Sequence, residues 1–514
     1  MVIKILLLVV FFAGMVAVGI SARRHAVSVS GFVLGGRSVG PWLTAFAYGT
    51  SYFSAVVFVG YAGQFGWKYG LASTWIGLGN AAIGSLLAWV MLGRRTRIMT
   101  QHLGSSTMPD FFEKRFDSKP LKIVASVIIF IFLIPYTASI YNGLSRLFEM
   151  AFNIPYAVCV VVMAAFTAVY VILGGYMATA ISDFIQGIIM LFGIVIVIAA
   201  VLSGQGGFMN AVYELAQLPS DAAPTLGQPG AFTAFFGPDP LNLLGVVILT
   251  SLGTWGLPQM IQKFYAIRNE KAVRTGTVIS TVFAVIVSGG CYFLGGFSRL
   301  FDDPAIYGAD GAVVYDSIIP FMLSKLPDIL IGIVVVLVLS ASMSTLSSLV
   351  LTSSSTLTLD LIKGNLWKNM REESQIRTMR VLIAVFVAVS VLLAINPPDF
   401  IAQLMGISWG ALAGAFLAPF LYGLYWKRVT RAAVWASFAC GVGLTVGNLF
   451  FHFIDSAINA GAAAMVLGLV VVPVVSLITP RQPDKRLQEI FSCYEEKTVL
   501  HKKMVVGTEK DNAE

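Results

Sequence analysis

Charged residues are scarce in this sequence. Asp, Glu, Lys and Arg make up 12% of the 514 residues, and hydrophobic residues make up 57%. A soluble domain carries about 25% charged residues. With a mean hydropathy of +0.82, the chain has too few polar and charged residues to cover a water-exposed surface. The composition predicts an all-α integral membrane protein.

Residues for catalysis or metal chelation are also few. The four cysteines and four histidines are dispersed without a CxxC pair, which argues against a disulfide framework or a zinc site. We find no HExxH, no P-loop and no GxSxG with suitable partners. The tail after Pro480 is far too short for a nucleotide-binding domain. The sequence therefore predicts that the protein is not an enzyme.

Long apolar runs are abundant instead. A membrane-spanning helix needs about 20 mostly apolar residues, and the sequence predicts thirteen of them. They cover 2–21, 41–63, 70–93, 121–142, 156–176, 178–202, 241–264, 276–296, 326–356, 379–396, 399–425, 432–452 and 461–479.

The basic residues predict the orientation. With the N-terminus outside, 29 Lys and Arg residues fall in inward loops and the tail, including Lys263, and 5 fall outside. Basic residues favour the cytoplasmic side, so we expect a multi-pass protein of the cell membrane with a cytoplasmic C-terminus. The same bias accounts for the net charge of +8 without a nucleic acid partner.

Two predicted spans contain helix-breaking residues. The stretches "FAYGTSYFSAV" (46–56) and "TSLGTWGLPQM" (250–260) both place Gly-Thr in mid-span. Glycine is also common where membrane helices pack closely, so one site alone would carry little weight. Paired interruptions five helices apart indicate an inverted repeat with a binding site between its halves. We expect an extra helix and loop (1–40), two repeats (41–202 and 203–425), two further helices (426–479) and a cytoplasmic tail (480–514).

Asp183 is the clearest acidic residue within a predicted span. A buried carboxylate needs a partner, and the predicted spans offer no basic residue for it. Hydroxyl groups, a proton or a bound cation are left as partners. The alternative is a partly hydrated carboxylate near the cytoplasmic interface.

The ninth span carries a run of hydroxyl groups, "SASMSTLSSL" (340–349). On a helix, Ala341, Ser344, Thr345 and Ser348 share one face. Hydroxyl and carbonyl oxygens are neutral ligands suited to alkali cations, whereas Mg²⁺ and Ca²⁺ recruit more carboxylates. The alternative is that the hydroxyls bond back to their own helix or join neighbouring helices. Composition alone does not decide between the two.

Three motifs resemble the sodium:solute symporters, in particular their proline/pantothenate-like branch. They are "LGGRSVGPW" (34–42), "LGGYMATAISDFIQG" (173–187) and "SASMSTLSSLVLTSSS" (340–355). The resemblance implies a five-plus-five inverted-repeat core of the LeuT type, with one helix before it and two after. It also implies a first Na⁺ site, formed by the carbonyls of Thr50, Phe53 and Ala341 and the hydroxyls of Ser344 and Thr345.

The resemblance further implies a second Na⁺ site that some members have. Its residues here are Asp183, Thr345, Ser347 and Ser348. One position departs from the family pattern, because proline carriers tend to have an acidic residue where this sequence has Tyr52. That departure puts proline itself in doubt as the substrate.

Together these features predict a monomeric Na⁺-coupled symporter that imports a small solute by alternating access. Broken-helix N-termini favour a carboxylate, so a monocarboxylate or a zwitterionic amino acid such as proline is expected. A sugar or other neutral solute is the alternative, and an ion channel is the alternative from a different class. The expected substrate contacts are Tyr52, Ser54, Tyr136, Tyr141, Trp255 and Gln259, with Gln403 and Trp409 as weaker candidates.

Overall fold

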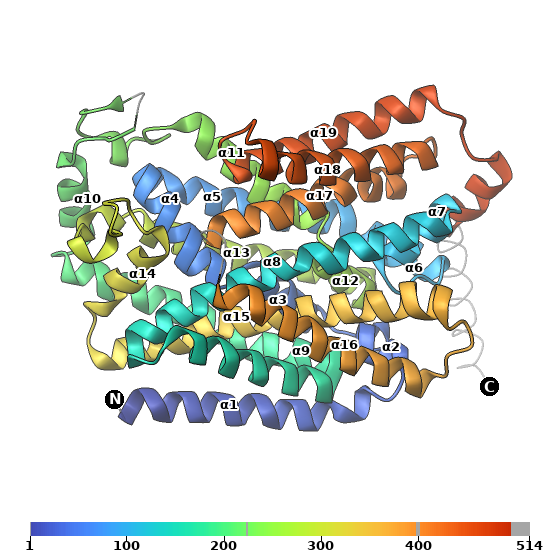
Figure 1. Cartoon of the computed structure of the whole chain (residues 1–514), viewed down its shortest axis with the longest axis horizontal. Helices are drawn as coiled ribbons and strands as arrows, with labels where there is room; N and C mark the ends of the chain where they lie inside the picture. Colours follow the sequence, from blue (N-terminus) through green and yellow to red (C-terminus); the bar gives the residue numbers. More distant parts are fainter. Residues whose placement is uncertain (1, 223–224, 397–400, 495–514) are drawn as a thin grey trace, which may run out of the picture.

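The computed structural model describes residues 2–222, 225–396 and 401–494, which form a long bundle of helices (Figure 1). The first part of the chain contains α1 (Val2–Ala22), α2 (Val29–Leu34), α3 (Pro41–Tyr52), α4 (Ala62–Tyr69), α5 (Thr74–Gly79), α6 (Arg94–His102), α7 (Met108–Phe116), α8 (Lys119–Phe152) and α9 (Tyr156–Gly204). The second part contains α10 (Phe208–Gln217), α11 (Pro240–Leu252), α12 (Pro258–Ala266), α13 (Glu270–Gly295), α14 (Tyr315–Ser324), α15 (Asp328–Thr356), α16 (Glu372–Ile395), α17 (Ile401–Tyr425), α18 (Arg431–Phe451) and α19 (Ala457–Ile478). Wider π-helical turns at Val56–Tyr61, Asn80–Leu87, Trp89–Gly93 and Leu357–Leu366 extend several of these helices.

Ten helical stretches of the described chain are long and apolar enough to cross a membrane, or eleven if the bent pair of α11 and α12 counts as one span. Helix α9 has 49 residues, a length of roughly 74 Å at 1.5 Å per residue. That is more than twice the thickness of a hydrocarbon core. Gly175 interrupts α9 with φ 55° and ψ −148°, and Gly70 interrupts the stretch Val56–His102 with φ 58°.

These two glycines fall where the sequence predicts the boundaries between neighbouring spans. The chain is therefore helical and multi-spanning as expected. The count of thirteen and the inverted repeat stay predictions. The start of the predicted span 399–425, the tail beyond 494 and residues 223–224 lie outside the described residues.

The two ends of the described chain lie at opposite ends of the bundle (Figure 1). Near the start of α1, Lys4 forms an ion pair of 2.9 Å with Asp328, the first residue of α15. At the other end, the ring Nε2 of His102 donates to the carbonyl of Glu489 at 3.0 Å. This arrangement agrees with an odd number of crossings.

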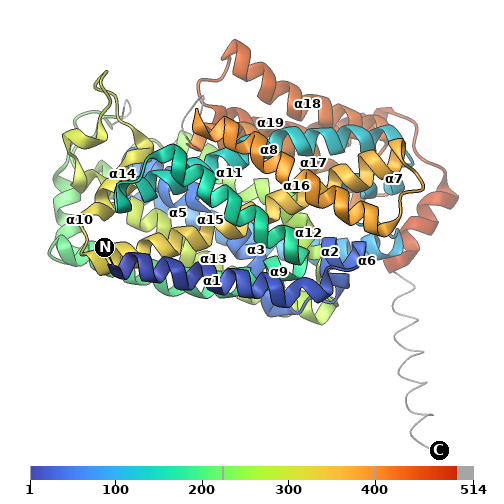
Figure 2. The same ribbon diagram turned by 60° about the horizontal axis from the view of Figure 1, so that its bottom comes forward.

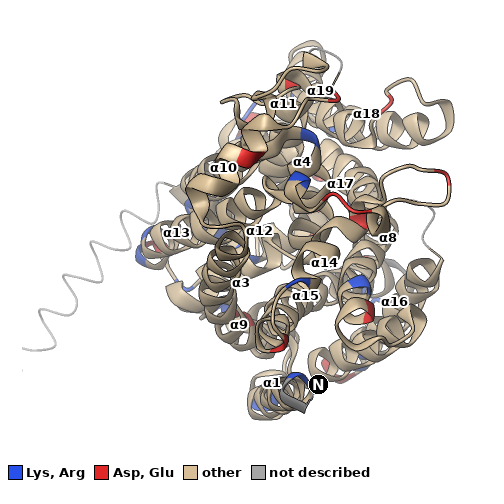
Figure 3. Ribbon diagram, turned by 90° about the vertical axis from the view of Figure 1, so that its left-hand side faces the viewer, with Lys and Arg blue, Asp and Glu red and all other residues tan. Residues whose placement is uncertain are grey.

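Helix α15 lies inside the bundle, where it packs against α3, α8 and α9. Helix α1 runs along the outside (Figure 2). Viewed along the bundle in Figure 3, α1 and α18 lie at the rim, whereas α3, α12 and α15 lie further in. Every residue of α15 from Leu337 to Thr356 is buried, so its hydroxyl groups face protein rather than solvent.

Both expected helix breaks are present. Helix α3 ends at Tyr52, and Phe53 has extended backbone angles (φ −110°, ψ 95°). Helix α11 continues through one tight turn, Gly253–Trp255, and α12 then begins at Pro258 with a bend of 41°. Pro258 suits this position because the first residue of a helix needs no backbone N–H. The first break brings the carbonyl of Thr50 within hydrogen-bonding distance of α15.

Candidate sodium and substrate sites

Two hydroxyl groups of α15 contact the end of α3. The Ser344 hydroxyl lies 3.0 Å from the carbonyl oxygen of Thr50 and 3.0 Å from that of Ala341. The Thr345 hydroxyl lies 3.2 Å from each of the same two carbonyls. Four of the five ligands predicted for the first Na⁺ site thus form one buried cluster of neutral oxygens.

Phe53, the fifth predicted ligand, lies at the same break. It lines a small cavity of about 10 Å³ together with Ser54 and Ala341. Its ring stacks on that of Tyr52, with ring centroids 4.2 Å apart. The break thus brings the end of α3 and one turn of α15 together around a compact set of hard oxygens, the donor type that Na⁺ prefers.

Asp183 of α9 is fully buried, which excludes the partly hydrated carboxylate that was the alternative. The expectation that no basic residue within the spans pairs with it is wrong. Lys263 of α12 is itself 1% exposed, and its Nζ lies 3.7 Å from the Asp183 Oδ2. Lys263 is therefore an interior residue and not a loop residue, because the bend before Pro258 turns α12 into the bundle.

The ammonium of Lys263 separates the residues predicted for the second Na⁺ site. It donates to the Ser348 hydroxyl at 2.9 Å, and Ser348 shares a hydrogen bond of 2.8 Å with Ser51. Asp183 and Ser348 thus lie around Lys263. Thr345 belongs to the first cluster, and Ser347 donates to a carbonyl of its own helix at 2.8 Å.

Three of the expected substrate residues form an aromatic cluster next to the α3 break. The ring of Trp409 lies 6.1 Å from that of Tyr52 and 5.8 Å from that of Tyr136, measured between centroids. The Tyr52 hydroxyl donates to the carbonyl of Thr250 on α11 at 2.5 Å. Tyr52 thereby links the two broken spans to each other.

The other expected substrate residues differ in their hydrogen bonding. Trp255 donates its indole N–H to a backbone carbonyl at 3.0 Å, and the Ser54 hydroxyl accepts a backbone N–H at 3.2 Å. Among the described residues, the buried amide of Gln259 and the buried hydroxyl of Tyr141 have no hydrogen-bond partner. Gln403 lies apart, in the wall of a cavity of about 740 Å³ near α4 and α11.

A family model for the sodium:solute symporter family matches residues 32–441. The chain belongs to this family. Na⁺ is accordingly its coupling ion. Among curated relatives, the osmoregulated proline transporter OpuE of Bacillus subtilis is 29% identical over 496 residues, covering 95% of this chain and 96% of the relative. A sodium/proline symporter of Escherichia coli is 29% identical over 447 residues, covering 85% and 86% of the two chains.

The structure of a Na⁺-coupled sialic acid symporter in a substrate-bound, outward-open state aligns with this symporter. The TM-score is 0.76 at 17% identity, over 93% of this chain and 98% of the other. At this identity, the likeness shows a shared LeuT-like fold.

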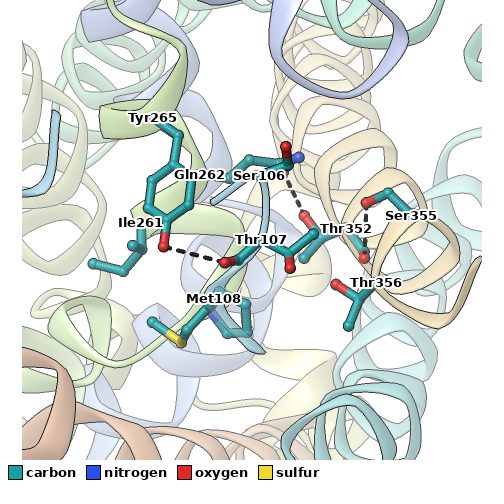
Figure 4. A pocket seen from close by; sticks show the side chains of 10 residues that line it. Ser106, Thr107, Met108, Ile261, Gln262, Tyr265, Thr352, Ser355 and Thr356 are labelled. Carbon is teal, nitrogen blue, oxygen red and sulfur yellow. Dashed lines mark hydrogen bonds between the residues drawn. The ribbon is translucent and has the colours of Figure 1, made fainter. Parts of the chain in front are cut away.

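One hydroxyl-lined pocket of the symporter was not expected from the sequence (Figure 4). Thr352 and Ser355 of α15 line it, one and two turns beyond Ser348 on the same face. Thr352 donates to the side-chain oxygen of Gln262 at 2.7 Å, and the Tyr265 hydroxyl donates to the Thr107 carbonyl at 3.4 Å. The polar face of α15 therefore continues past Lys263 towards the end of the bundle that carries α6 and α7.

Lys263 and Ser51 are the site residues that sequence reasoning missed. The signal for Lys263 was its position five residues after Pro258, within "PQMIQKFYA". In a helix that begins at Pro258, Lys263 lies more than one turn after the start. It shares a face with Gln259, four residues before it. Ser51 follows Thr50 directly, so the helix-breaking Gly-Thr pair of the first broken span pointed to it as well as to Thr50.

Proposed function

We propose that this symporter couples the inward movement of Na⁺ to the uptake of a small monocarboxylate or zwitterionic amino acid, such as proline, by alternating access. The observation that carries the proposal is the buried cluster in which Ser344 and Thr345 meet the carbonyls of Thr50 and Ala341. The proline transporters among its relatives support the substrate class.

In this proposal, Na⁺ binds among the carbonyls of Thr50, Phe53 and Ala341 and the hydroxyl oxygens of Ser344 and Thr345. The hydroxyl protons turn away from the ion, so that both hydroxyls present lone pairs to it. The bound ion then joins α15 to the break in α3. Because the Tyr52 ring stacks directly on Phe53, this also fixes one wall of the substrate pocket.

The substrate pocket lies beside this site, in the proposal, and uses Tyr52, Ser54, Tyr136, Tyr141, Trp255 and Gln259. The unpartnered amide of Gln259 offers both a donor and an acceptor, which suits a zwitterion that carries both kinds of group. Linkage requires that Na⁺ and substrate raise each other's affinity by the same factor.

The proposed topology has thirteen spans, with breaks at Gly70 and Gly175 separating merged helices, and a five-plus-five inverted repeat. We place the N-terminus outside and the C-terminus in the cytoplasm of a monomer in the cell membrane. The distribution of basic residues supports this orientation.

Uptake into proteoliposomes tests the proposal. Radiolabelled proline and a panel of monocarboxylates, amino acids and sugars are offered with an inward Na⁺ gradient and with choline in its place. We expect accumulation of one solute against its gradient only with Na⁺. Equilibration without Na⁺ would favour a channel, and accumulation of a sugar alone would replace the substrate class.

Ser344→Ala and Thr345→Ala test the ion site. Loss of one oxygen that contacts a charged group costs about 1.5–3 kcal/mol, so the Na⁺ concentration for half-maximal uptake should rise roughly 10- to 150-fold. Ser342→Ala is the matched control, because its buried hydroxyl bonds back to its own helix at 2.7 Å. Equal Na⁺ activation in all three variants and the wild type would reject the site.

A further inference from the structure

A positive charge of the chain itself lies where the family resemblance places a second Na⁺. The Lys263 ammonium reaches this position from α12, between Asp183 of α9 and Ser348 of α15. Its side chain is 2% exposed and that of Asp183 is 0% exposed. Neither residue therefore has solvent to balance its charge.

The surroundings of the ammonium are those of a bound monovalent cation. A hydroxyl oxygen of Ser348 lies at 2.9 Å, a carboxylate oxygen of Asp183 at 3.7 Å and the ring centroid of Tyr176 at 5.3 Å. Ammonium groups and Na⁺ both favour oxygen donors and negative charge. An ammonium is additionally attracted to the face of an aromatic ring.

The charge balance at this position argues against a second ion. Neither carboxylate oxygen of Asp183 has a hydrogen-bond partner among the described residues, and the ammonium of Lys263, 3.7 Å from Oδ2, is the positive charge that balances it. The pair is neutral as a unit. A Na⁺ bound between Asp183 and Ser348 would lie next to the ammonium, and the two cations would repel each other in a buried setting where such repulsion is strong.

We propose that Lys263 is a tethered cation that takes the place of the second Na⁺, so that this symporter binds one Na⁺ and not two. The inference rests on the proposed Na⁺ site at Thr50, Ser344 and Thr345. A tethered charge cannot be released to the cytoplasm. It therefore joins α12 to α9 and α15 without contributing to the driving force, whereas a second Na⁺ would add its own share of the membrane potential.

Binding of ²²Na⁺ to the purified full-length protein in detergent tests this without knowledge of the substrate. We expect Lys263→Ala to bind one Na⁺ more than the wild type, because the freed carboxylate and hydroxyl then accept the ion. The double variant Lys263→Met with Asp183→Asn removes both charges, and it should bind the same number as the wild type. An unchanged number in folded Lys263→Ala would overturn the inference.

The difference in bound Na⁺ between Lys263→Ala and the wild type tests the role of the lysine. The number of Na⁺ ions bound by the wild type tests the proposed function. Wild-type protein with no bound Na⁺ would reject the first site, whereas a gain of one ion in Lys263→Ala would still support the tethered cation. If Lys263→Ala folds poorly, its thermal unfolding is compared in equal concentrations of NaCl and choline chloride. Selective recovery in NaCl supports the inference, and equal loss of stability in both salts overturns it.

Discussion

Removing either charge of the Lys263–Asp183 pair should destabilise the protein far more than removing both. Nζ and Oδ2 are 3.7 Å apart, and an effective dielectric constant of about 20 gives an attraction of about 4.5 kcal/mol. Breaking a buried pair costs about 3–5 kcal/mol because one charge is left uncompensated. Replacing both residues by neutral ones of similar size costs little by the same principle. The coupling energy is the cost of the double change minus the two single costs, so we expect a magnitude between the attraction of about 4.5 kcal/mol and the summed single costs of about 6–10 kcal/mol.

The assay is a double-mutant cycle of Lys263→Met and Asp183→Asn, with the free energy of unfolding measured by titration with choline dodecyl sulfate in mixed micelles. Choline replaces Na⁺ throughout, so that no ion substitutes for the missing ammonium. The control cycle uses Arg299 and Asp221, which are closer at 2.7 Å, although the Asp221 side chain is 61% exposed. Exposed pairs contribute about 0–1 kcal/mol. A coupling for the buried pair that is no larger than the control would refute the ion pair.

Two further predictions concern packing and acid stability. Gly66→Ala should lower the free energy of unfolding by about 1–3 kcal/mol through overpacking, because an added Cβ would overlap the backbone of α13. Gly443→Ala is the control. It has open space around it, so the same unfolding assay should show no change. Burial alone would raise the pKa of Asp110, but the ammonium groups of Lys122 and Lys114 outweigh it and hold this pKa below its ordinary value. The stabilisation by Asp110 is thus present above the unfolded-state pKa of about 4 and lost as the pH falls through the lower folded-state pKa. Asp110→Asn should lower the unfolding temperature at neutral pH, and the difference in unfolding temperature between variant and wild type should shrink in acid. A difference in unfolding temperature that stays constant with pH would contradict the pairing of Asp110 with the two lysines.

The meeting of Ser344 and Thr345 with the carbonyls of Thr50 and Ala341 could be predicted in part from the sequence, because its signals are local. Ser344 and Thr345 share a face by helical periodicity, and the Gly-Thr pair that includes Thr50 marks the end of a helix a few residues later. Each pattern is contained within about one turn of helix. What the sequence did not supply was the contact between them, which the family resemblance provided.

The partner of Asp183 could not be predicted in the same way. Lys263 is separated from it by 80 positions in the numbering, and it lies near the end of an apolar run, where a lysine usually reaches water. Only the 41° bend between α11 and α12 brings it into the interior. There α12 packs against α3 and α15, whereas α11 packs against α17 and α19, and hydropathy carries no information about such packing.

The hydroxyls of Ser344 and Thr345 each have two hydrogen-bond acceptors. This lowers the energy needed to move α3 away from α15. One acceptor, the Thr50 carbonyl, belongs to α3, and the other, the Ala341 carbonyl, belongs to their own helix. If α3 moves away from α15, each hydroxyl keeps the second acceptor, so neither proton is left unsatisfied in an apolar interior. The contact between these helices can therefore open and close with little enthalpic penalty, and under the proposed function the presence or absence of the ion decides which arrangement is populated.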